Sequence, residues 1–449
     1  GVAYDLPMTE LQPRKPFDWG NAVFGEGKPP KIPAVEGIYA GAYVVQPRDA
    51  PGMAPVQFML ISRDGKMLTY LAPAGITILD TAVPRVGILE QELTVGRTGP
   101  AKGYQLFLPA GVQLWITGRD GAYLRARLSA DQEVWVPKSA LRFLPAGTPP
   151  PVNEVIVART QTLKDRVRIR VFLQQRIPFG VQQFSRPQRL ILRLYGAISK
   201  TDWIRHDFED PLVGHIQWKQ AARKVYELWI DLNTKQQWGY KAYYEGNDLI
   251  LEIRKPPLLK HGGSPLKNLL ICVDPGHGPD LGAIGPTGQA EKDATLRYAY
   301  TLKQLLEKKG ARVFLTREGS YGINLASRTK IAEAVNAHIF VSLHFNALPD
   351  GVNPFHSRGT STYYYHTQSY PLAKEVQRQL LRKTRLPNFG LFYDNLAVCR
   401  MTWMPSILVE PAFIMHPAEE MKILDPKFQR KVCEGIVAGL EKFVKKSKN

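Results

Sequence analysis

Cysteine and long apolar runs are both scarce in this chain of 449 residues. The three cysteines, Cys272, Cys399 and Cys433, show no CxxC spacing, which excludes a disulfide scaffold and a thiolate zinc finger. We interpret them as small buried apolar residues. No stretch approaches the roughly 18 uninterrupted apolar residues of a membrane helix, so we expect no membrane span.

Acidic side chains are outnumbered: the chain has 59 Lys and Arg but only 40 Asp and Glu, which gives a net charge of +19. The basic residues are spread along the chain without an RRM, zinc-finger or Walker signature, and we therefore expect no nucleic-acid partner. An anionic cell wall would suit this charge equally well. The hydrophobic fraction of 44% is typical of globular proteins, and the length predicts several domains.

The first part of the chain is predicted to be all-β. Residues 1–34 are rich in proline and form an extended lead-in; the chain begins at Gly1 without the basic and apolar regions of an export signal, so we expect a mature or trimmed protein. Residues 35–146 carry short apolar runs separated by turn signals, as a β domain does. Residues 145–151 are rich in proline and are interpreted as a stiff linker. The segment 147–256 alternates polar with apolar positions, which predicts a β-sandwich of half-buried strands.

The hydrophobic period changes in the last part of the chain. Residues 257–266 contain proline and glycine and are interpreted as a linker. Residues 267–449 alternate apolar strand runs with amphipathic helical patterns. This alternation predicts an α/β domain with a mainly parallel sheet wrapped by helices. The expected fold class is therefore multidomain, with N-terminal all-β modules before an α/β domain.

Four side chains of the α/β part carry the candidate chemistry. His277 follows the first strand, His344 and Glu410 end two later strands, and Glu291 precedes a helix. The carboxyl ends of parallel strands meet at one sheet edge, where two imidazoles and two carboxylates suffice for a mononuclear zinc hydrolase with a free carboxylate base. A packed histidine, a paired carboxylate and an acidic helix start are the plainer interpretations. The spacings are no short-range zinc motif, so the hypothesis depends on placement.

A family resemblance adds to this interpretation. Residues 266–443 resemble the zinc-dependent N-acetylmuramoyl-L-alanine amidases of the amidase-3 branch. Six motifs follow in the family's order: Asp274-Pro-Gly-His-Gly278, Glu291-Lys-Asp293, Leu315-Thr-Arg317, Leu325-Ala-Ser-Arg328, Ser342-Leu-His-Phe-Asn-Ala347 and Pro405-Ser-Ile-Leu-Val-Glu410. The resemblance implies hydrolysis of the amide between the lactyl group of N-acetylmuramic acid and L-alanine in peptidoglycan. It also implies that His277, Glu291 and His344 bind Zn²⁺ and that Glu410 is the catalytic base.

Other residues of this part have less specific roles. The loop after His277 is one residue shorter than the family's double-glycine loop and sets Asp280 three residues after His277. This spacing resembles that of zinc carboxypeptidases, so Asp280 is the reserve zinc ligand should Glu291 lie too far away. Arg317, Arg328 and Arg358 are candidates for binding the stem-peptide carboxylates by paired hydrogen bonds, although arginine on a helix surface is the commoner case. The tyrosines of residues 363–365 are interpreted as packing residues of a strand.

The two upstream regions also resemble known modules. Val95-Gly-Arg-Thr-Gly-Pro100 and Glu133-Val-Trp-Val136 are similar to the early Gly-Pro turn and the closing strand of the bacterial SH3-like cell-wall domain, which residues 93–144 resemble. The half-buried strands of residues 147–256 resemble the AMIN module. These resemblances imply a periplasmic or secreted, cell-wall-associated enzyme that the modules localise on peptidoglycan. The sequence does not identify an activating protein. The stretch 344–372 is short, which predicts no autoinhibitory helix. Two alternatives stay open: a wall-binding protein with an inactive amidase domain, and a zinc carboxypeptidase acting on peptide ends.

Overall fold

The computed structural model describes residues 8–10, 39–40, 49–80, 82–207, 210–259, 263–348, 353, 355 and 358–448. Most of the predicted lead-in of residues 1–34 lies outside the described residues. Strand β1 (Thr9–Glu10) pairs antiparallel with β2 (Tyr39–Ala40). None of the described helices combines the length and apolarity needed to cross a bilayer.

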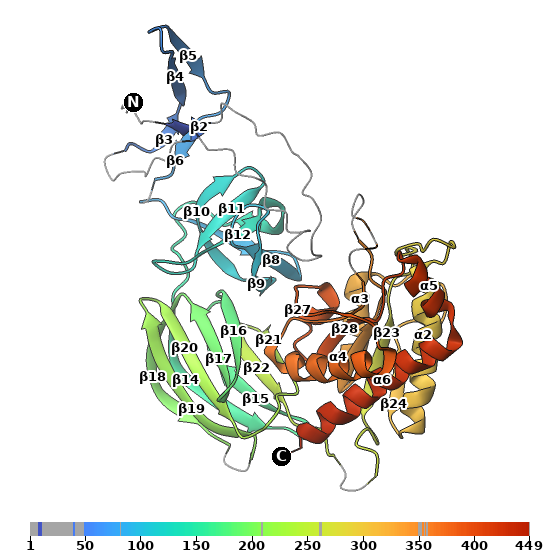
Figure 1. The fold of residues 1–449 in the computed structure, drawn as a ribbon. Coiled ribbons are helices and arrows are strands. Elements are labelled where there is room, and N and C mark those ends of the chain that lie inside the picture. The colour runs from blue at the N-terminus through green and yellow to red at the C-terminus, as the bar shows by residue number, and fades with distance from the viewer. Residues whose placement is uncertain are drawn as a thin grey trace.

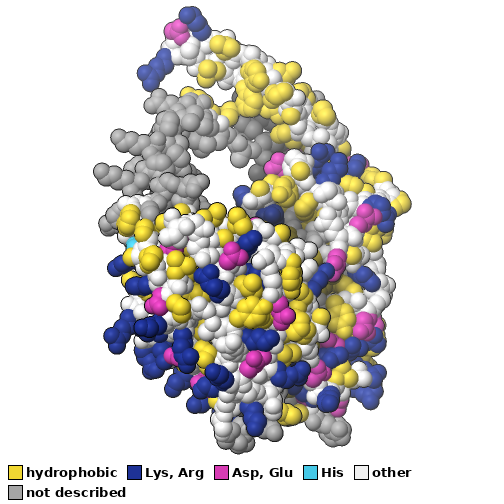
Figure 2. Space-filling model, turned by 90° about the vertical axis from the view of Figure 1, so that its right-hand side faces the viewer, with side chains coloured by type: hydrophobic (Ala, Val, Ile, Leu, Met, Phe, Trp, Pro, Cys, Tyr) yellow, Lys and Arg dark blue, Asp and Glu magenta, His cyan; other side chains and the backbone are white. Residues whose placement is uncertain are grey.

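Residues 52–78 form a small arm at the N-terminal end of the molecule (Figure 1). It consists of two separate two-stranded sheets, β3 (Gly52–Ala54) with β6 (Ile76–Ile78) and β4 (Gln57–Ile61) with β5 (Met67–Leu71). The side chains of β4 and β5 are exposed although most of them are apolar, and Figure 2 shows hydrophobic side chains gathered on this arm. The arm shares no sheet with the strands that follow it.

A seven-stranded antiparallel sheet comes next, in the order β13-β7-β10-β11-β12-β8-β9. Its strands are β7 (Arg85–Leu89), β8 (Leu93–Arg97), β9 (Tyr104–Pro109), β10 (Gln113–Asp120), β11 (Tyr123–Arg127), β12 (Glu133–Pro137) and β13 (Leu141–Phe143), with the short 3-10 helix η1 (Lys138–Ala140) before the last. Alternate residues such as Leu114, Leu124 and Val136 are fully or almost fully buried, because successive side chains of a strand point to opposite faces. Their packing gives this sheet its own core.

Two further sheets form the middle of the chain and share one core. A five-stranded sheet has the order β18-β14-β15-β22-β21, and a four-stranded sheet has the order β16-β17-β20-β19. The strands are β14 (Asn153–Thr162), β15 (Arg166–Val171), β16 (Phe179–Ser185), β17 (Gln188–Tyr195), β18 (Ala197–Arg205), β19 (Val213–Ala222), β20 (Val225–Leu232), β21 (Tyr240–Glu245) and β22 (Asp248–Arg254). Ile169 and Leu251 of one sheet and Leu192 and Leu228 of the other are buried in this core.

The C-terminal part is built on a six-stranded sheet of order β24-β23-β25-β28-β26-β27. Its pairs are parallel except that β26 runs antiparallel to β28, which fits the predicted mainly parallel sheet. The strands are β23 (Leu270–Pro275), β24 (Arg312–Leu315), β25 (Ile339–Leu343), β26 (Thr360–Tyr364), β27 (Asn388–Tyr393) and β28 (Ser406–Glu410). The helices are α2 (Glu291–Lys308), α3 (Leu325–Ala334), α4 (Tyr370–Thr384), α5 (Pro417–Leu424) and α6 (Pro426–Lys446), with the 3-10 helices η2 (Thr367–Ser369) and η3 (Ala397–Arg400).

Helices cover both faces of this sheet (Figure 1). Ile271 and Val273 of β23 face a core that α2, α4 and α6 complete. Cys272, between them, faces the opposite core, to which α3 and η3 contribute. A strand buried on both faces explains the continuous apolar run of the sequence. All three cysteines are free and buried, as predicted.

The middle sheets are joined to the C-terminal part by buried contacts. The guanidinium of Arg254, at the end of β22, donates to the carbonyl oxygens of Asn336, at 2.9 Å, and Ala337. Trp238 is 1% exposed and belongs to the core beneath α6, where its ring centroid lies 5.6 Å from that of Phe443. These contacts come from residues before the predicted linker at 257–266 and hold the two parts together.

Candidate active site

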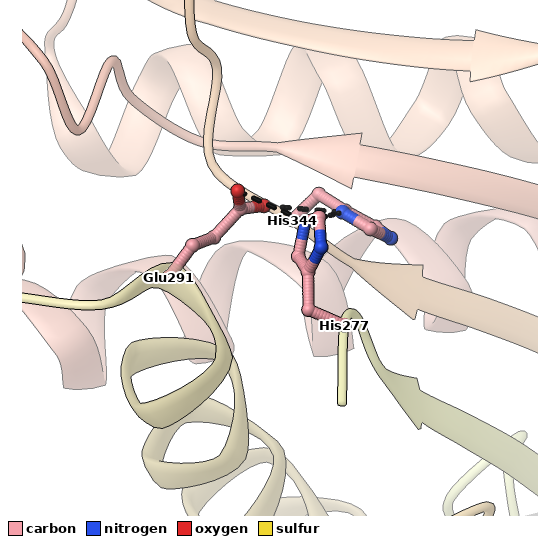
Figure 3. Close-up of side chains that lie close together, drawn as sticks. All are labelled: His277, Glu291 and His344. Atoms are coloured by element: carbon pink, nitrogen blue, oxygen red, sulfur yellow. Dashed lines mark hydrogen bonds and ion pairs between the residues drawn. The ribbon is translucent and has the colours of Figure 1, made fainter. Parts of the chain in front are cut away.

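Three side chains from three different elements meet at the carboxyl edge of the six-stranded sheet (Figure 3). His277 lies in the loop after β23, His344 directly follows β25, and Glu291 is the first residue of α2. We call these residues the His-Glu-His cluster. The ligand atoms that they offer lie within 4.8 Å of one another. The structure therefore brings together the three residues predicted to bind metal.

The distances within the His-Glu-His cluster are short. Nε2 of His277 lies 2.9 Å from Oε2 of Glu291, and Nδ1 of His344 lies 3.1 Å from Oε1 of the same carboxylate. The two imidazole nitrogens are 3.1 Å apart. A tetrahedral zinc ion with bonds of about 2.0–2.1 Å holds its ligand atoms about 3.3 Å apart. The donor set and its spacing therefore fit one zinc ion.

Backbone amides fix the carboxylate of Glu291. The amide of Phe345 donates to Oε1 at 2.9 Å, and the amide of Ala283 donates to Oε2 at 3.0 Å. Burial alone would raise the pKa of Glu291, but the hydrogen bonds from His277 and His344 lower it well below its usual value. Glu291 is only 3% exposed. It is thus an ionised, pre-oriented ligand rather than a residue that merely begins a helix.

His277 is held in an uncommon backbone conformation. Its φ angle is 65°, in the left-handed region that non-glycine residues seldom adopt and that is often retained at functional sites. Its Nδ1 atom lies 2.5 Å from Oδ1 of Asp280, which leaves Nε2 to face Glu291. Burial alone would lower the pKa of His277, but the hydrogen bonds to Glu291 and Asp280 raise it. Asp280 therefore orients a ligand and lies outside the three-residue cluster; its predicted reserve role applies only to a distant Glu291, and Glu291 is close.

Two glycines make room for the cluster. A Cβ atom at Gly276 would lie 2.4 Å from the ring of His344. A Cβ atom at Gly282, whose φ is +66°, would lie 2.6 Å from Cδ2 of His277 and 2.8 Å from Cβ of Glu291. Contacts this short require the ligands to move, so both glycines are needed for the observed geometry.

Arg328 is buried beneath the loop that carries His277. Its guanidinium forms an ion pair with Asp274 at 2.7 Å and donates to the carbonyl oxygens of Pro275, His277 and Gly278. These donors are used inside the protein, where Arg328 is 4% exposed. The sequence predicts a substrate-binding arginine here, whereas the structure shows an arginine that fixes the ligand loop.

Arg317 has a similar position. It is 1% exposed, and its guanidinium donates to the carbonyl oxygens of Pro275, Gly276 and Lys292 at 2.7–3.0 Å. It therefore ties the loop after β23 to the start of α2 and differs from the predicted substrate contact. Arg358, in contrast, is exposed and lies two residues before the start of β26.

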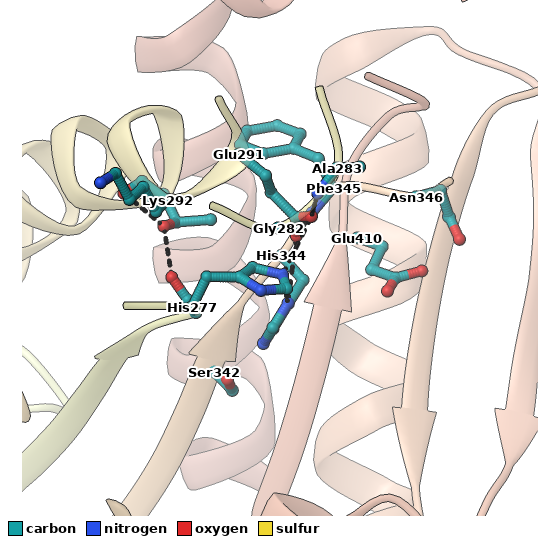
Figure 4. Close-up of polar contacts among 12 residues, drawn as sticks. His277, Gly282, Ala283, Glu291, Lys292, Ser342, His344, Phe345, Asn346 and Glu410 are labelled. Atoms are coloured by element: carbon teal, nitrogen blue, oxygen red, sulfur yellow. Dashed lines mark hydrogen bonds and ion pairs between the residues drawn. The ribbon is translucent and has the colours of Figure 1, made fainter. Parts of the chain in front are cut away.

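Glu410 ends β28 beside the His-Glu-His cluster, as Figure 4 shows. Ser361, its pairing partner on β26, places Oγ 3.5 Å from Oε2 of Glu410. Asn346 donates to the same Oγ at 2.7 Å, and the Tyr363 hydroxyl lies 3.3 Å from it. Removal from water raises the pKa of Glu410 to about 8, and the negative charge of Glu291 acts in the same direction. Glu410 is thus a carboxylate poised between its two protonation states near neutral pH.

Sequence reasoning did not identify the residues around Glu410. Ser361 and Tyr363 belong to a strand that the sequence indicates only as a packing element, and its antiparallel pairing with β28 brings them to Glu410. Asn346 lies in the motif Ser342-Leu-His-Phe-Asn-Ala347, in which the sequence singles out only the histidine. The spacing of two residues between His344 and Asn346 could have indicated it, because alternate side chains of an extended segment point to the same side of the sheet.

Comparisons with known proteins match this region. The family described as N-acetylmuramoyl-L-alanine amidase matches residues 271–442. The chain is 33% identical over 239 residues to the probable cell wall amidase LytH of Staphylococcus aureus, covering 51% of this chain and 77% of that protein. It is 34% identical over 183 residues to the LytH protein of Staphylococcus epidermidis, covering 40% of this chain and 60% of that protein.

A solved structure is similar to part of the chain. The N-acetylmuramoyl-L-alanine amidase from Clostridium difficile 630 is 33% identical, and the match covers 41% of this chain and all of that one, with a TM-score of 0.39. The chain spans about 60% of the length of the Staphylococcus epidermidis relative.

Proposed function

The chain belongs to the N-acetylmuramoyl-L-alanine amidase family, and we propose that it hydrolyses the amide between the lactyl group of N-acetylmuramic acid and L-alanine of the peptidoglycan stem peptide. The observation that carries this proposal is the His-Glu-His cluster with Glu410 beside it. The printed names of its relatives, which are cell wall amidases, support the choice of substrate.

His277, Glu291 and His344 are the residues that would hold Zn²⁺. One neutral nitrogen from each imidazole and one carboxylate form a three-ligand set that is common among catalytic zinc sites. When bound there, zinc supplies Lewis acidity that polarises the scissile carbonyl and makes a nearby water molecule more acidic. The carboxylate of Asp280 and the amides at Phe345 and Ala283 keep the ligands oriented.

Glu410 acts as the general base and then as the general acid. Its carboxylate takes a proton from the attacking water and delivers it to the leaving nitrogen of L-alanine. A pKa near 8 suits both steps, because the group can accept and release a proton near neutral pH. Glu410 would ionise more readily beside a cation held by Glu291, since the charge of Glu291 is one cause of the raised pKa.

The three arginines have different proposed roles. Arg317 and Arg328 hold the loop that carries His277, as their hydrogen bonds to its carbonyl oxygens support. Arg358 is exposed before the strand that carries Ser361, and it is the one of the three that we propose to bind a stem-peptide carboxylate.

The N-terminal sheets are proposed to deliver the enzyme to the cell wall. The proposed division is a lead-in at 1–34, a β domain with an SH3-like module at 35–146, an AMIN-like sandwich at 147–256, a linker at 257–266 and the catalytic domain at 267–449. Each of the three sheet systems has a main core of its own, which supports this division, although Trp238, Tyr195 and Val225 of the middle part also pack into the neighbouring cores. We propose a periplasmic or secreted, wall-associated location.

Product analysis tests the proposed function. Digestion of a soluble muropeptide should yield a free lactyl carboxylate and a peptide with a new L-alanine amine, both identified by mass spectrometry. Release of a terminal amino acid would identify a carboxypeptidase instead. No cleavage by the zinc-loaded protein would identify a wall-binding protein and refute the enzyme.

A further inference from the structure

A second site lies far along the chain from the His-Glu-His cluster, at the joint between the seven-stranded sheet and the middle sheets. A pocket of about 300 Å³ opens there. Its walls include Trp115 of β10 and Arg127 of β11 on one side, and Tyr195, Arg223 and Lys224 of the middle sheets on the other. Pro151 of the predicted linker contributes a further wall. We call this cavity the joint pocket.

The joint pocket is formed by a fixed contact between the two sheet systems. The amide of Gln113 donates to the carbonyl oxygen of Arg176 at 3.0 Å, and the guanidinium of Arg176 donates to Ala110 O at 3.0 Å. Tyr195 and Val225 of the middle sheets are buried in the core of the seven-stranded sheet. Because apolar packing and backbone hydrogen bonds cross the joint, the pocket is preformed rather than opened by motion between modules.

The charge of the joint pocket has one sign. Arg127, Arg223 and Lys224 line it, and no Asp or Glu is among its described lining residues. Within the described part of the chain, none of these three cations takes part in an ion pair. Three unpaired cations around an apolar floor attract a ligand that carries negative charge on a compact, partly apolar skeleton.

Local structure holds these cations in place. The guanidinium carbon of Arg127 lies 5.1 Å from the ring centroid of Trp115, a cation–π distance. Lys224 has a φ of 60°, and its carbonyl oxygen accepts from the amides of Gly196, at 2.7 Å, and Ala197, at 3.1 Å. The turn that carries Arg223 and Lys224 is therefore tied to the segment after Tyr195 on the same wall of the pocket, which reduces the ordering cost of binding.

We propose that the joint pocket binds a carboxylate-bearing segment of peptidoglycan, apart from the candidate active site. The choice of ligand rests on the proposed function, whereas the cationic pocket stands on its own geometry. Two sources share this chemistry. One is the stem peptide with its free carboxylates, and the other is a glycan strand already freed of its peptides, whose muramic acids carry lactyl carboxylates.

Binding can be measured without cleavage, since neither probe contains the scissile amide. The full chain is titrated with a peptide-free glycan strand and with a free stem peptide, and Trp115 serves as a local fluorescence reporter. Binding of either probe should change the tryptophan fluorescence, and the Trp115→Phe variant should lose that change. The probe that binds identifies the source of the carboxylate.

Removal of the three charges tests the pocket itself. The variant Arg127→Gln, Arg223→Gln, Lys224→Gln should bind the carboxylate probe roughly tenfold or more weakly. The matched control Arg119→Gln, Lys164→Gln, Lys431→Gln removes the same charge from exposed positions outside the pocket and should bind like the parent chain. Both variants should have the melting temperature of the parent chain, because the substituted side chains are exposed or partly exposed.

Other outcomes overturn the proposal. Equal binding by the pocket variant and its control would do so, as would binding of a glycerol-phosphate polymer without binding of either carboxylate probe. Turnover of a small muropeptide is measured separately on the pocket variant and should be unchanged. A chain that binds the probe through the joint pocket but cleaves nothing would refute the proposed function and still support the joint pocket as a binding site.

Discussion

Asp280 and His277 form a carboxylate–imidazole pair in which Oδ1 of Asp280 lies 2.5 Å from Nδ1 of His277. The pair directs Nε2 of His277 toward Glu291 and the centre of the His-Glu-His cluster. Carboxylates placed in this way fix the tautomer and orientation of a metal-binding histidine. The one-residue-shorter loop seen in the sequence thus provides an orienting residue.

Substitution of Asp280 should weaken metal binding without abolishing it. The variant Asp280→Asn keeps the side-chain volume but loses the charge that orients His277, and we expect the zinc affinity to fall about 10- to 100-fold. A competition titration with a chromogenic chelator measures this affinity. His277→Ala, which removes a ligand outright, should lose more. Parent-like affinity in Asp280→Asn would show that the pair does not support the site.

The pH dependence of turnover should respond to Tyr363. The hydrogen bond from its hydroxyl lowers the pKa of Glu410, against the larger upward effect of desolvation. In Tyr363→Phe this bond is absent, so the pKa of Glu410 should rise. Because the general base must be ionised, the acidic limb of the kcat/KM profile should move to higher pH.

The matched control for this prediction is Tyr364→Phe. Tyr364 follows Tyr363 on β26 and packs instead on Tyr370, with ring centroids 5.2 Å apart. Its profile should coincide with that of the parent chain. An unmoved acidic limb in Tyr363→Phe, or the same shift in both variants, would contradict the assignment of Glu410 as the base that titrates.

Acid should destabilise the chain through His338. Burial and the positive charge of Arg254 lower the pKa of His338 to about 4. The unfolded chain takes up this proton near pH 6.5, so stability is present above that pH and is lost as the pH falls toward 4. Between pH 7 and pH 5 the loss should reach at most about 2 kcal/mol for this group.

Urea unfolding at pH 7 and pH 5 measures this loss. In His338→Asn, the side-chain oxygen can still accept from the amide of Leu270, as Nδ1 of His338 does at 2.9 Å, but it does not titrate. The difference between the two pH values should therefore be smaller in the variant. An identical difference in both proteins would exclude His338 as the source.

The contact between the middle sheets and the catalytic part should be needed for stability. Trp238 fills the core beneath α6 from outside the α/β part, and Trp238→Ala should cost about 3–5 kcal/mol of unfolding free energy. Trp203→Ala is the control, since Trp203 is 71% exposed and its loss should have little effect. Equal melting temperatures for the two variants would show that the two parts are independent.

The sequence predicts the strand ends well and the supporting contacts poorly. An apolar run followed by Asp274-Pro-Gly-His-Gly278 places His277 at the sheet edge, because strand and loop are local patterns. The partners of Arg317 and Arg328 are backbone carbonyl oxygens, which carry no sequence signal. The sequence likewise assigns Trp238 to the β-sandwich. Its contact with Phe443 could not be predicted, because the two residues lie about two hundred positions apart in sequence. Long-range contacts of this kind require the fold.

The turnover of Glu410→Gln, measured with zinc content on the same sample, tests the central claim most directly. The substitution keeps the volume and removes the basicity, so the protein should retain about one zinc ion per chain while kcat on a soluble muropeptide falls by roughly two to four powers of ten. Glu291→Gln should instead lose zinc first, because Glu291 is the proposed ligand. Parent-like turnover in Glu410→Gln, or loss of its zinc together with its activity, would contradict the account.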